Sequence, residues 1–186
     1  MGTNLNIYFS MAISGGRQKQ PTGKDLIEHC KTLGHVLNGY IGKKNVNYRE
    51  RKNFDIYSRN DAWIEQADIV IAEVSVHSFG VGIEIEKAIN NKIPVLCLYD
   101  KIMLDENQIS KMLTSCRSIK LVGYKTNADA KRIIDEFVKE HGFENAEVEV
   151  KTEEDALAVP GHPGCTYNDC RECHDVSCMV HQGFEP

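Results

Sequence analysis

The sequence predicts a doubly wound α/β fold, in which a five-stranded parallel sheet carries helices on both faces. Short runs rich in Val, Ile and Leu are typical of strands that are buried on both faces. Between these runs, apolar residues recur three and four positions apart, which is the spacing of a helix that packs on one side. Strands that alternate with helices form parallel sheets, and we expect the flavodoxin-like strand order 2-1-3-4-5.

The first strand is expected at residues 5–9, and it leads into a loop that contains Gly15 and Gly16. Two adjacent glycines indicate unusual backbone angles or a close backbone contact. A helix follows, with Thr22 as its expected N-cap and Gly34 as its expected C-cap.

The second strand is expected at residues 35–37, and a polar segment rich in Lys and Arg follows it at residues 38–53. A loop of this length is either a binding loop, whose cations meet an anion, or a solvated connection. The next helix is expected at residues 54–66. Its inward-facing residues are expected to be Ile56, Trp63 and Ile64.

The second half of the chain repeats the same alternation. One helix is expected to begin at Gly80-Val81-Gly82, and a short helix is expected at residues 108–116. The last helix is expected to have Asn127 as its cap. The strands that separate them are expected at residues 69–74, 95–99 and 118–122.

The composition is that of a globular protein, with 41% hydrophobic and 26% charged residues. A net charge of −5 argues against a nucleic acid as a general partner, although a mononucleotide needs only a local positive site. No apolar run approaches the length of a membrane span, and the N-terminus lacks the features of a signal peptide. We therefore expect a cytoplasmic protein without a membrane partner, in which Cys30, Cys97 and Cys116 are buried thiols.

The chain is organised around the strand, loop and helix between Asp68 and Asn91. A helix N-terminus favours anions, and Gly80 and Gly82 would let a phosphate approach the backbone. Glu84 is expected in the first turn of this helix, where the dipole would keep its carboxylate ionised. From the glycines alone, an ordinary turn with a surface glutamate explains the pattern equally well.

The residues that flank these glycines favour a helix start that binds an anion over an ordinary turn. Ala72-Glu73-Val74 and Ser78-Phe79-Gly80-Val81-Gly82-Ile83-Glu84 resemble the signature of the nucleoside 2-deoxyribosyltransferase superfamily. The most similar branch is that of the 2'-deoxynucleoside 5'-phosphate N-hydrolases, where an A-E-V…S-x-G-V-G-x-E string ends in the catalytic glutamate. The resemblance extends to about residue 141. It implies that Glu84 is the nucleophile, that Tyr8 orients it, and that Ser78, Gly80 and Gly82 hold the 5'-phosphate.

The loop after the first strand resembles the G-S-I-R-G-G loop of the family, which cups the sugar and the phosphate. Ile13, Gly15 and Gly16 match this string, whereas Ser14 stands where the family has an arginine. Arg17 is close enough in sequence to supply the lost charge. The substitution leaves open whether the substrate is a nucleotide or a nucleoside.

Two further segments resemble the family. The string from Ile56 to Trp63 resembles I-Y-x-R-D-x-x-W, in which the Asp contacts the deoxyribose. Asn60 aligns with that Asp and Asp61 follows it, so both are candidates for the sugar contact. Ser110 matches a family serine that reaches the phosphate in the neighbouring subunit, which implies a homodimer.

The predicted function is hydrolysis of the N-glycosidic bond of 2'-deoxynucleoside 5'-monophosphates, through a glutamyl-sugar intermediate and without a cofactor or metal at the site. A carboxylate can stabilise or bond to the developing cation at C1', and a 2-deoxy sugar forms that cation readily. One alternative is base exchange between deoxynucleosides, which the serine at position 14 favours. Another is a nucleotide-sensing or adaptor domain without catalysis.

The domain prediction places the α/β domain at residues 1–145 and an acidic, then Cys- and His-rich tail at residues 146–186. The spacing C-x4-C-x2-C-x4-C in the tail fits a zinc site, a flexible tail without metal, or disulfides. The cysteines of this tail are Cys165, Cys170, Cys173 and Cys178.

Overall fold

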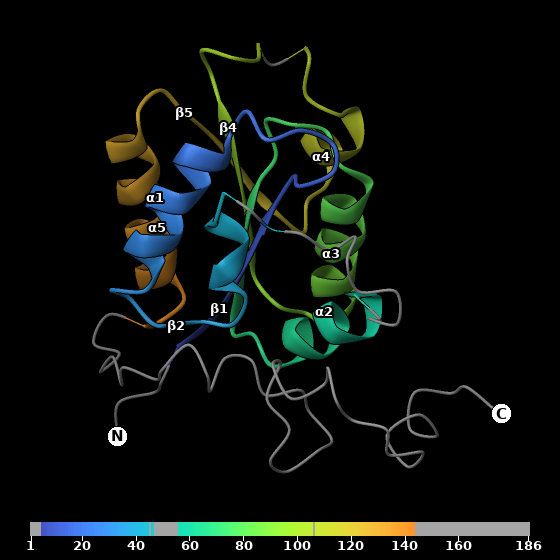
Figure 1. The fold of residues 1–186 in the computed structure, drawn as a ribbon, viewed down its shortest axis with the longest axis vertical. Coiled ribbons are helices and arrows are strands. Elements are labelled where there is room, and N and C mark those ends of the chain that lie inside the picture. The colour runs from blue at the N-terminus through green and yellow to red at the C-terminus, as the bar shows by residue number, and fades with distance from the viewer. Residues whose placement is uncertain (1–4, 45, 47–55, 106, 144–186) are drawn as a thin grey trace, which may run out of the picture. The chain divides into compact units, whose positions relative to one another are not determined.

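The computed structural model describes residues 5–44, 46, 56–105 and 107–143. In this part of the chain, five parallel strands form one sheet in the order β2-β1-β3-β4-β5 (Figure 1). The predicted fold class and strand order are confirmed. The strands are β1 (Asn6–Met11), β2 (His35–Val36), β3 (Ile69–Glu73), β4 (Val95–Asp100) and β5 (Lys120–Tyr124).

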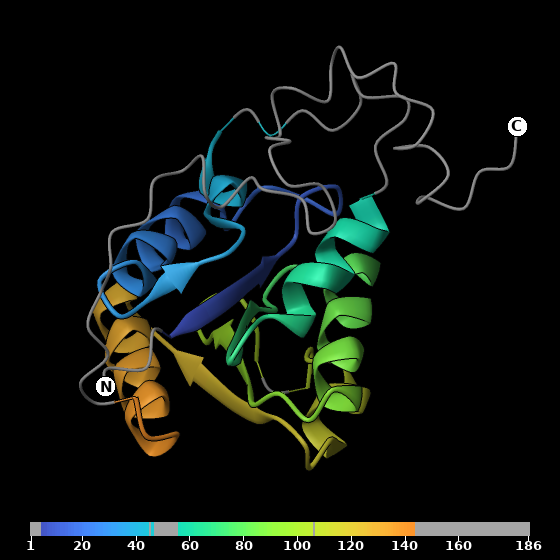
Figure 2. The same ribbon diagram turned by 90° about the horizontal axis from the view of Figure 1, so that it is seen from below.

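Helices cover both faces of the sheet (Figures 1 and 2). One face carries α1 (Gln20–Cys30) and α5 (Asn127–Glu140). The other face carries α2 (Ile56–Glu65), α3 (Phe79–Asn90) and the short α4 (Lys111–Ser115). Each face has its own apolar cluster, so the molecule has a layered core in which the sheet is the middle layer.

The alternation of side chains along β1 positions the residues that matter for function. Phe9 and Met11 belong to the cluster under α1 and α5, whereas Tyr8 belongs to the cluster under α2 and α3. Because successive strand residues point to opposite faces, Ser10 points the same way as Tyr8. β1 therefore offers two hydroxyl groups to the face that α3 covers.

The first helix starts earlier than predicted. It begins at Gln20, with a proline in its first turn, so Thr22 lies inside the helix and is not its N-cap. Proline suits the first turn because the amide that it lacks has no partner there. Gly34 follows the helix without a positive φ, and a Cβ on it would lie 2.3 Å from the carbonyl oxygen of Leu5. Its role is close backbone approach rather than a left-handed cap.

The predicted boundaries in the second half of the chain also shift. Thr126, not Asn127, caps α5, and its hydroxyl and the Asp129 carboxylate form a reciprocal capping box. The predicted apolar stripe of α5 is buried, as expected. β5 lies two residues later than predicted, and α4 is shorter than the predicted helix.

The start of the predicted polar loop packs against the sheet. The side chain of Asn38 is buried and hydrogen-bonds to the backbone of Phe9, accepting at 3.0 Å and donating at 2.7 Å. The 3-10 turn η1 (Gly39–Gly42) follows and buries Ile41. Of the two interpretations that the sequence left open, the solvated connection is wrong for this part, because Asn38 and Ile41 are buried against the rest of the domain. Residues 45 and 47–53, with most of the cations, lie outside the described residues.

The expectations about the single cysteines and membrane spans can be compared with the described residues, whereas those about the tail cannot. Cys30 and Cys97 are buried thiols, as predicted, whereas Cys116, at the C-terminal end of α4, is only half-buried, so that part of the prediction is wrong. No helix in the described ranges is long and apolar enough to cross a membrane. The predicted tail lies outside the described residues, so its boundary at residue 145 and the role of its cysteines, Cys165, Cys170, Cys173 and Cys178, stay predictions.

Candidate active site

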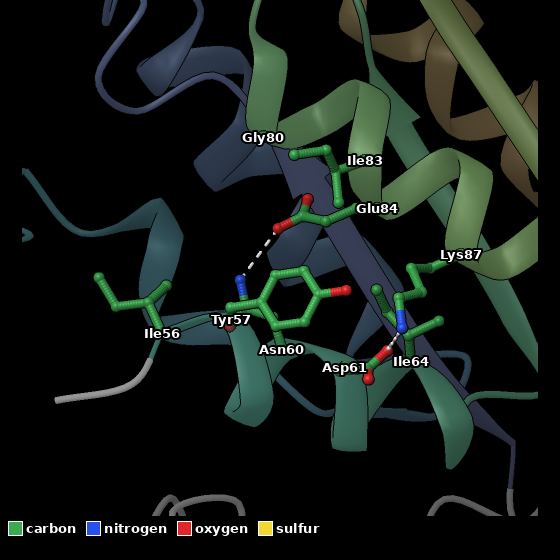
Figure 3. Close-up of a pocket in the computed structure, with 9 residues that line it drawn as sticks. All are labelled: Ile56, Tyr57, Asn60, Asp61, Ile64, Gly80, Ile83, Glu84 and Lys87. Atoms are coloured by element: carbon green, nitrogen blue, oxygen red, sulfur yellow. Dashed lines mark hydrogen bonds and ion pairs between the residues drawn. The ribbon is translucent and has the colours of Figure 1, made fainter. Parts of the chain in front are cut away.

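Glu84 lies where three elements meet, on the side of α3 that faces β1 and α2 (Figure 3). Ser78 caps α3, and its hydroxyl oxygen accepts from the amide of Val81 at 3.5 Å. Because the helix begins at Phe79, Glu84 lies in its second turn, and the prediction of a first-turn carboxylate is wrong. The helix dipole acts mainly within the first turn, so other groups must hold the Glu84 carboxylate.

Three side chains donate hydrogen bonds to this carboxylate. The Tyr8 hydroxyl and the Asn60 amide each donate to Oε1 at 2.9 Å. The Ser10 hydroxyl donates to Oε2. The structure therefore brings together Tyr8, Asn60 and Glu84, which the sequence predicted as site residues. Sequence reasoning missed Ser10, although strand alternation two residues after Tyr8 was a signal for it.

Burial and hydrogen bonding act on Glu84 in opposite directions. Burial raises the pKa of Glu84, whereas the hydroxyls of Ser10 and Tyr8, the amide of Asn60 and the charge of Arg59 lower it, and the pKa stays above its usual value. The pKa of Tyr8 is well above its usual value, because of burial and then because of the Glu84 charge. Tyr8 therefore keeps its proton and acts as a donor to the carboxylate.

The structure separates the two candidates for the sugar contact. Asn60 contacts Glu84, whereas Asp61, one position further along α2, forms an ion pair with Lys87 at 2.7 Å. Successive residues on a helix do not share a face, so only one of the two can point at Glu84. Figure 3 shows both interactions side by side.

A cavity of about 270 Å³ lies beside Glu84, between α2 and α3 (Figure 3). Its wall is mostly apolar, and its polar side chains include Glu84, Asn60 and the Asp61–Lys87 pair. Ile56 was expected to face the core, but it is 37% exposed and lines this cavity instead. The lining residues are Ile56, Tyr57, Asn60, Asp61, Ile64, Gly80, Ile83, Glu84 and Lys87.

The loop after β1 lies against the loop that precedes α3. A Cβ on Gly15 would lie 2.5 Å from the carbonyl oxygen of His77, so only a glycine lets the two loops approach this closely. Gly16 has a φ of 143°, which favours glycine. Ser14 is exposed, and Ile13 packs against the core. These loops follow β1 and β3, the central strands at whose carboxyl ends α/β proteins bind ligands.

The remaining predicted binding residues lie around this edge of the sheet. The Arg17 guanidinium donates to the carbonyl oxygens of Ile41 at 3.2 Å and Lys43 at 2.7 Å. Gly80 lies in the first turn of α3, where amides lack helical partners, whereas the amide of Gly82 donates to the carbonyl oxygen of Ser78 at 3.2 Å. Ser110 is half-buried at the start of α4. In the described residues it makes no hydrogen bond to the Glu84 cluster.

Comparisons with known proteins identify relatives. The sequence is 32% identical over 112 residues to a Methanococcoides burtonii protein that bears the name 2'-deoxynucleoside 5'-phosphate N-hydrolase 1, a match that covers 59% of this chain and 88% of that protein. It is 35% identical over 98 residues to the mouse 5-hydroxymethyl-dUMP N-hydrolase, covering 50% of this chain and 57% of the mouse protein. No family model matches the sequence. The solved structure of a Clostridium botulinum CMP N-glycosidase superposes with a TM-score of 0.49 and 18% identity, over 71% of this chain and 98% of that one.

Proposed function

Because the chain belongs to the 2'-deoxynucleoside 5'-phosphate N-hydrolase family, we propose that it hydrolyses the N-glycosidic bond of 2'-deoxynucleoside 5'-monophosphates with Glu84 as nucleophile. The products are a free base and 2-deoxyribose 5-phosphate. The observation that carries this assignment is the Glu84 carboxylate, which three side chains hold at the edge of a cavity.

The chemistry needs a carboxylate close to C1' of the sugar. As the bond to the base breaks, positive charge builds at C1', and an oxygen of Glu84 bonds to that carbon while the base leaves with the bonding electrons. The oxygen of a water molecule then bonds to C1' as the bond between Glu84 and C1' breaks, which frees the carboxylate. One proton of that water ends on the departed base, so the products are the neutral base and the sugar phosphate. Tyr8, Ser10 and Asn60 keep the carboxylate aimed in one direction, which lowers the entropy cost of the attack.

The phosphate would lie at the start of α3. The Ser78 hydroxyl accepts from Val81 and can donate its own hydrogen to a phosphate oxygen. Gly80 offers a first-turn amide and leaves the surface open for close approach. The loop of Ile13, Ser14, Gly15, Gly16 and Arg17 would close the other side. A cytoplasmic location suits this substrate and the free thiols of Cys30 and Cys97.

The active form is proposed to be a homodimer, in which Ser110 of one subunit reaches the phosphate in the other. Two observations support an interface at this edge of the sheet. Phe79, the first residue of α3, is 97% exposed, and Met112 in α4 is 82% exposed. Exposed apolar side chains mark an interface where they belong to one contiguous patch, and the proposed interface would bring Phe79 and Met112 into such a patch.

Base exchange between deoxynucleosides is the second candidate. Ser14 favours it, because an exposed serine in place of an arginine offers less charge to a 5'-phosphate. The two reactions share the same nucleophile and differ in whether water or a second base resolves the intermediate. A binding domain without turnover is the third candidate.

The test is to incubate the protein with deoxynucleoside monophosphates or deoxynucleosides, with and without an acceptor base, and to separate the products by chromatography. Base release from monophosphates alone supports hydrolysis, and exchange that requires an acceptor supports the transferase. Tight binding without turnover supports the third candidate. Glu84→Ala should abolish either reaction while leaving the circular dichroism spectrum unchanged.

A further inference from the structure

Arg59 is a buried cation one residue away from a group that contacts Glu84. Its side chain is only 4% exposed. The guanidinium carbon lies 4.5 Å from the ring centroid of Trp63 and 5.3 Å from that of Tyr40. The two ring centroids are 6.0 Å apart, so the guanidinium packs against both rings, and such packing holds an arginine in one orientation.

The guanidinium fixes the orientation of the neighbouring amide. Arg59 Nε and Nη2 lie 3.2 Å and 2.9 Å from Oδ1 of Asn60. Because a guanidinium can only donate, the amide oxygen must face Arg59, and the amide nitrogen must then face the other way. That nitrogen lies 2.9 Å from Glu84 Oε1, and an ionised carboxylate can only accept. The hydrogen bonds that link Arg59, Asn60 and Glu84, which we call the relay, can therefore all form in only one orientation of the Asn60 amide.

We propose that Arg59 is a positioning residue for the glycosidic cleavage, which acts through Asn60 to aim the Glu84 carboxylate and keep it ionised. This inference rests on the proposed function. Asn60 is polarised by two donors on its oxygen, so its N–H is a stronger donor to the carboxylate than an isolated amide would be.

The charges around Glu84 support this role. From β1, Tyr8 and Ser10 contribute neutral hydroxyls, and Tyr40 of η1 packs against the guanidinium. From α2 and α3, Asp61 and Lys87 pair with each other at 2.7 Å and so largely cancel. The positive charge of Arg59 lowers the pKa of both Glu84 and Tyr8, against the effect of burial.

The amide at position 60 avoids a second negative charge beside Glu84. An aspartate there would accept the same two bonds from Arg59 but would present a second carboxylate to Glu84. Two carboxylates in contact cannot both stay ionised without a rise in pKa. Asn60 thus transmits the positive field of Arg59 without adding a negative charge, and Asn60→Asp should raise the pKa of Glu84.

The experiment compares the pH dependence of kcat/KM for a deoxynucleoside monophosphate in wild type, Arg59→Met, Asn60→Ala and the double variant. Arg59→Met should lower kcat more than it changes KM, by about tenfold, as expected for one charge-assisted bond. It should also move the acid limb of the profile upward by about one pH unit. In the Asn60→Ala background the same change should have a much smaller effect on kcat, because the relay is already broken. Fully additive losses in kcat with an unmoved acid limb would overturn the proposal.

Two controls separate positioning from folding. Arg59→Lys keeps the charge but not the two-pronged contact, so it should restore the acid limb while recovering only part of kcat. If Arg59→Met does not fold, Arg59→Lys carries the test, alone and in the Asn60→Ala background. A loss of kcat in Arg59→Lys that is the same in both backgrounds would then contradict the relay.

A readout without turnover separates failure of the inference from failure of the proposed function. The titration of the Glu84 carboxyl carbon can be followed by carbon NMR in the wild type and in each variant. A raised titration midpoint in Arg59→Met and Asn60→Asp supports the relay even if no monophosphate is cleaved. An unchanged midpoint in both variants refutes it even if the enzyme is active.

Discussion

Glu84 has a carboxylate whose ionisation is set by opposing local effects, because burial raises its pKa and neighbouring donors lower it. A nucleophilic carboxylate must be ionised, so activity should fall as the pH drops through the pKa of Glu84. The donors around Glu84 therefore control the acid side of the pH profile. Removing any one of these donors should raise the pKa of Glu84 and so narrow the pH range in which the protein is active.

Tyr8→Phe removes one of these donors without changing the size of the ring. The pKa of Glu84 should rise, because the hydroxyl of Tyr8 now stabilises the ionised form. We expect the acid limb of kcat/KM to move to higher pH and the plateau to fall about tenfold. Tyr124→Phe is a matched control, because that hydroxyl donates to Glu73 on the other face of the sheet. An acid limb that moves equally in both variants would contradict a local effect at Glu84.

Glu73 is a second buried carboxyl group, and it affects stability. Its side chain is fully buried, and Oε1 accepts from the hydroxyls of Ser75 and, at 2.9 Å, Tyr124. Burial raises its pKa above the usual value, although both hydroxyls and Lys19 lower it. A carboxyl group whose pKa is higher in the folded state favours folding at low pH. That contribution is lost as the pH rises through the folded-state pKa.

The stability of the Glu73→Gln variant should therefore increase relative to that of the wild type as the pH rises. The difference in unfolding free energy, wild type minus variant, should fall as the pH rises from the unfolded-state pKa of a glutamate, about 4.3, through the higher folded-state pKa, because the unfolded-state carboxyl ionises first. The expected fall is about 1.4 kcal/mol for each pH unit between the two pKa values. Urea denaturation at a series of pH values measures it. A difference that stays constant over this range would show that Glu73 has the same pKa in both states.

The motif around Glu84 made several of these residues predictable, and the strand pattern explains why others were not predicted. Tyr8 and Asn60 could be named from their resemblance to family positions, and the structure places both against Glu84. Ser10 carries no motif, because its role depends only on pointing to the same face as Tyr8. The first-turn assignment of Glu84 was wrong because glycines can occur inside the first turn as well as before it, so they do not mark where α3 begins.

At the scale of elements, the loops after β1 and β3 meet closely at the carboxyl edge of the sheet. Gly15 allows this contact, since a Cβ there would lie 2.5 Å from the carbonyl oxygen of His77. Among the residues that the structure describes, no atom outside the backbone of α3 lies within 4 Å of a Cβ on Gly82. The two glycines therefore differ in what an added methyl group would do, although both lie in segments that resemble family motifs.

Gly15→Ala should push the two loops apart. We expect a loss of about 1–3 kcal/mol in unfolding free energy from the steric overlap. We also expect a higher KM for the monophosphate, since both loops are proposed to hold it. Gly82→Ala is the matched control for stability and should gain about 1 kcal/mol, because alanine favours a helix. Thermal unfolding and steady-state kinetics measure these effects. A Gly15→Ala variant as stable as wild type would show that the loops can separate without cost.

At the scale of the whole molecule, the topology was the most predictable property. Five strands that alternate with helices leave few arrangements, because crossovers between parallel strands are right-handed and both faces must be covered. The ends of elements were less predictable, as Thr126 shows. Threonine and asparagine both cap helices, and only the Asp129 partner decides between positions 126 and 127. The assembly of subunits depends on surfaces that no strand or helix pattern encodes.

If the protein is a homodimer with shared sites, two defective variants should restore each other's activity, which two separate monomers cannot do. If each site combines Glu84 of one subunit with Ser110 of the other, a subunit that lacks either residue can be complemented by a partner that lacks the other. Exposed Phe79 and Met112 lie at the starts of α3 and α4, close in sequence to the groups that would be shared. Glu84→Ala removes the nucleophile, and Ser110→Ala removes the phosphate contact.

Mixing the two variants after denaturation and joint refolding should therefore restore activity that neither has alone. In a mixed dimer, the subunit with Ser110→Ala supplies Glu84 and its partner supplies Ser110, so one of its two sites is complete and the other lacks both residues. Because equal mixing makes about half of the dimers mixed, activity should approach about a quarter of the wild-type value. Kinetics at subsaturating monophosphate measure it, where the Ser110 contact matters most. Activity that equals the average of the separate variants would mean that each site is built from one chain, and Ser110 would then have no part in it.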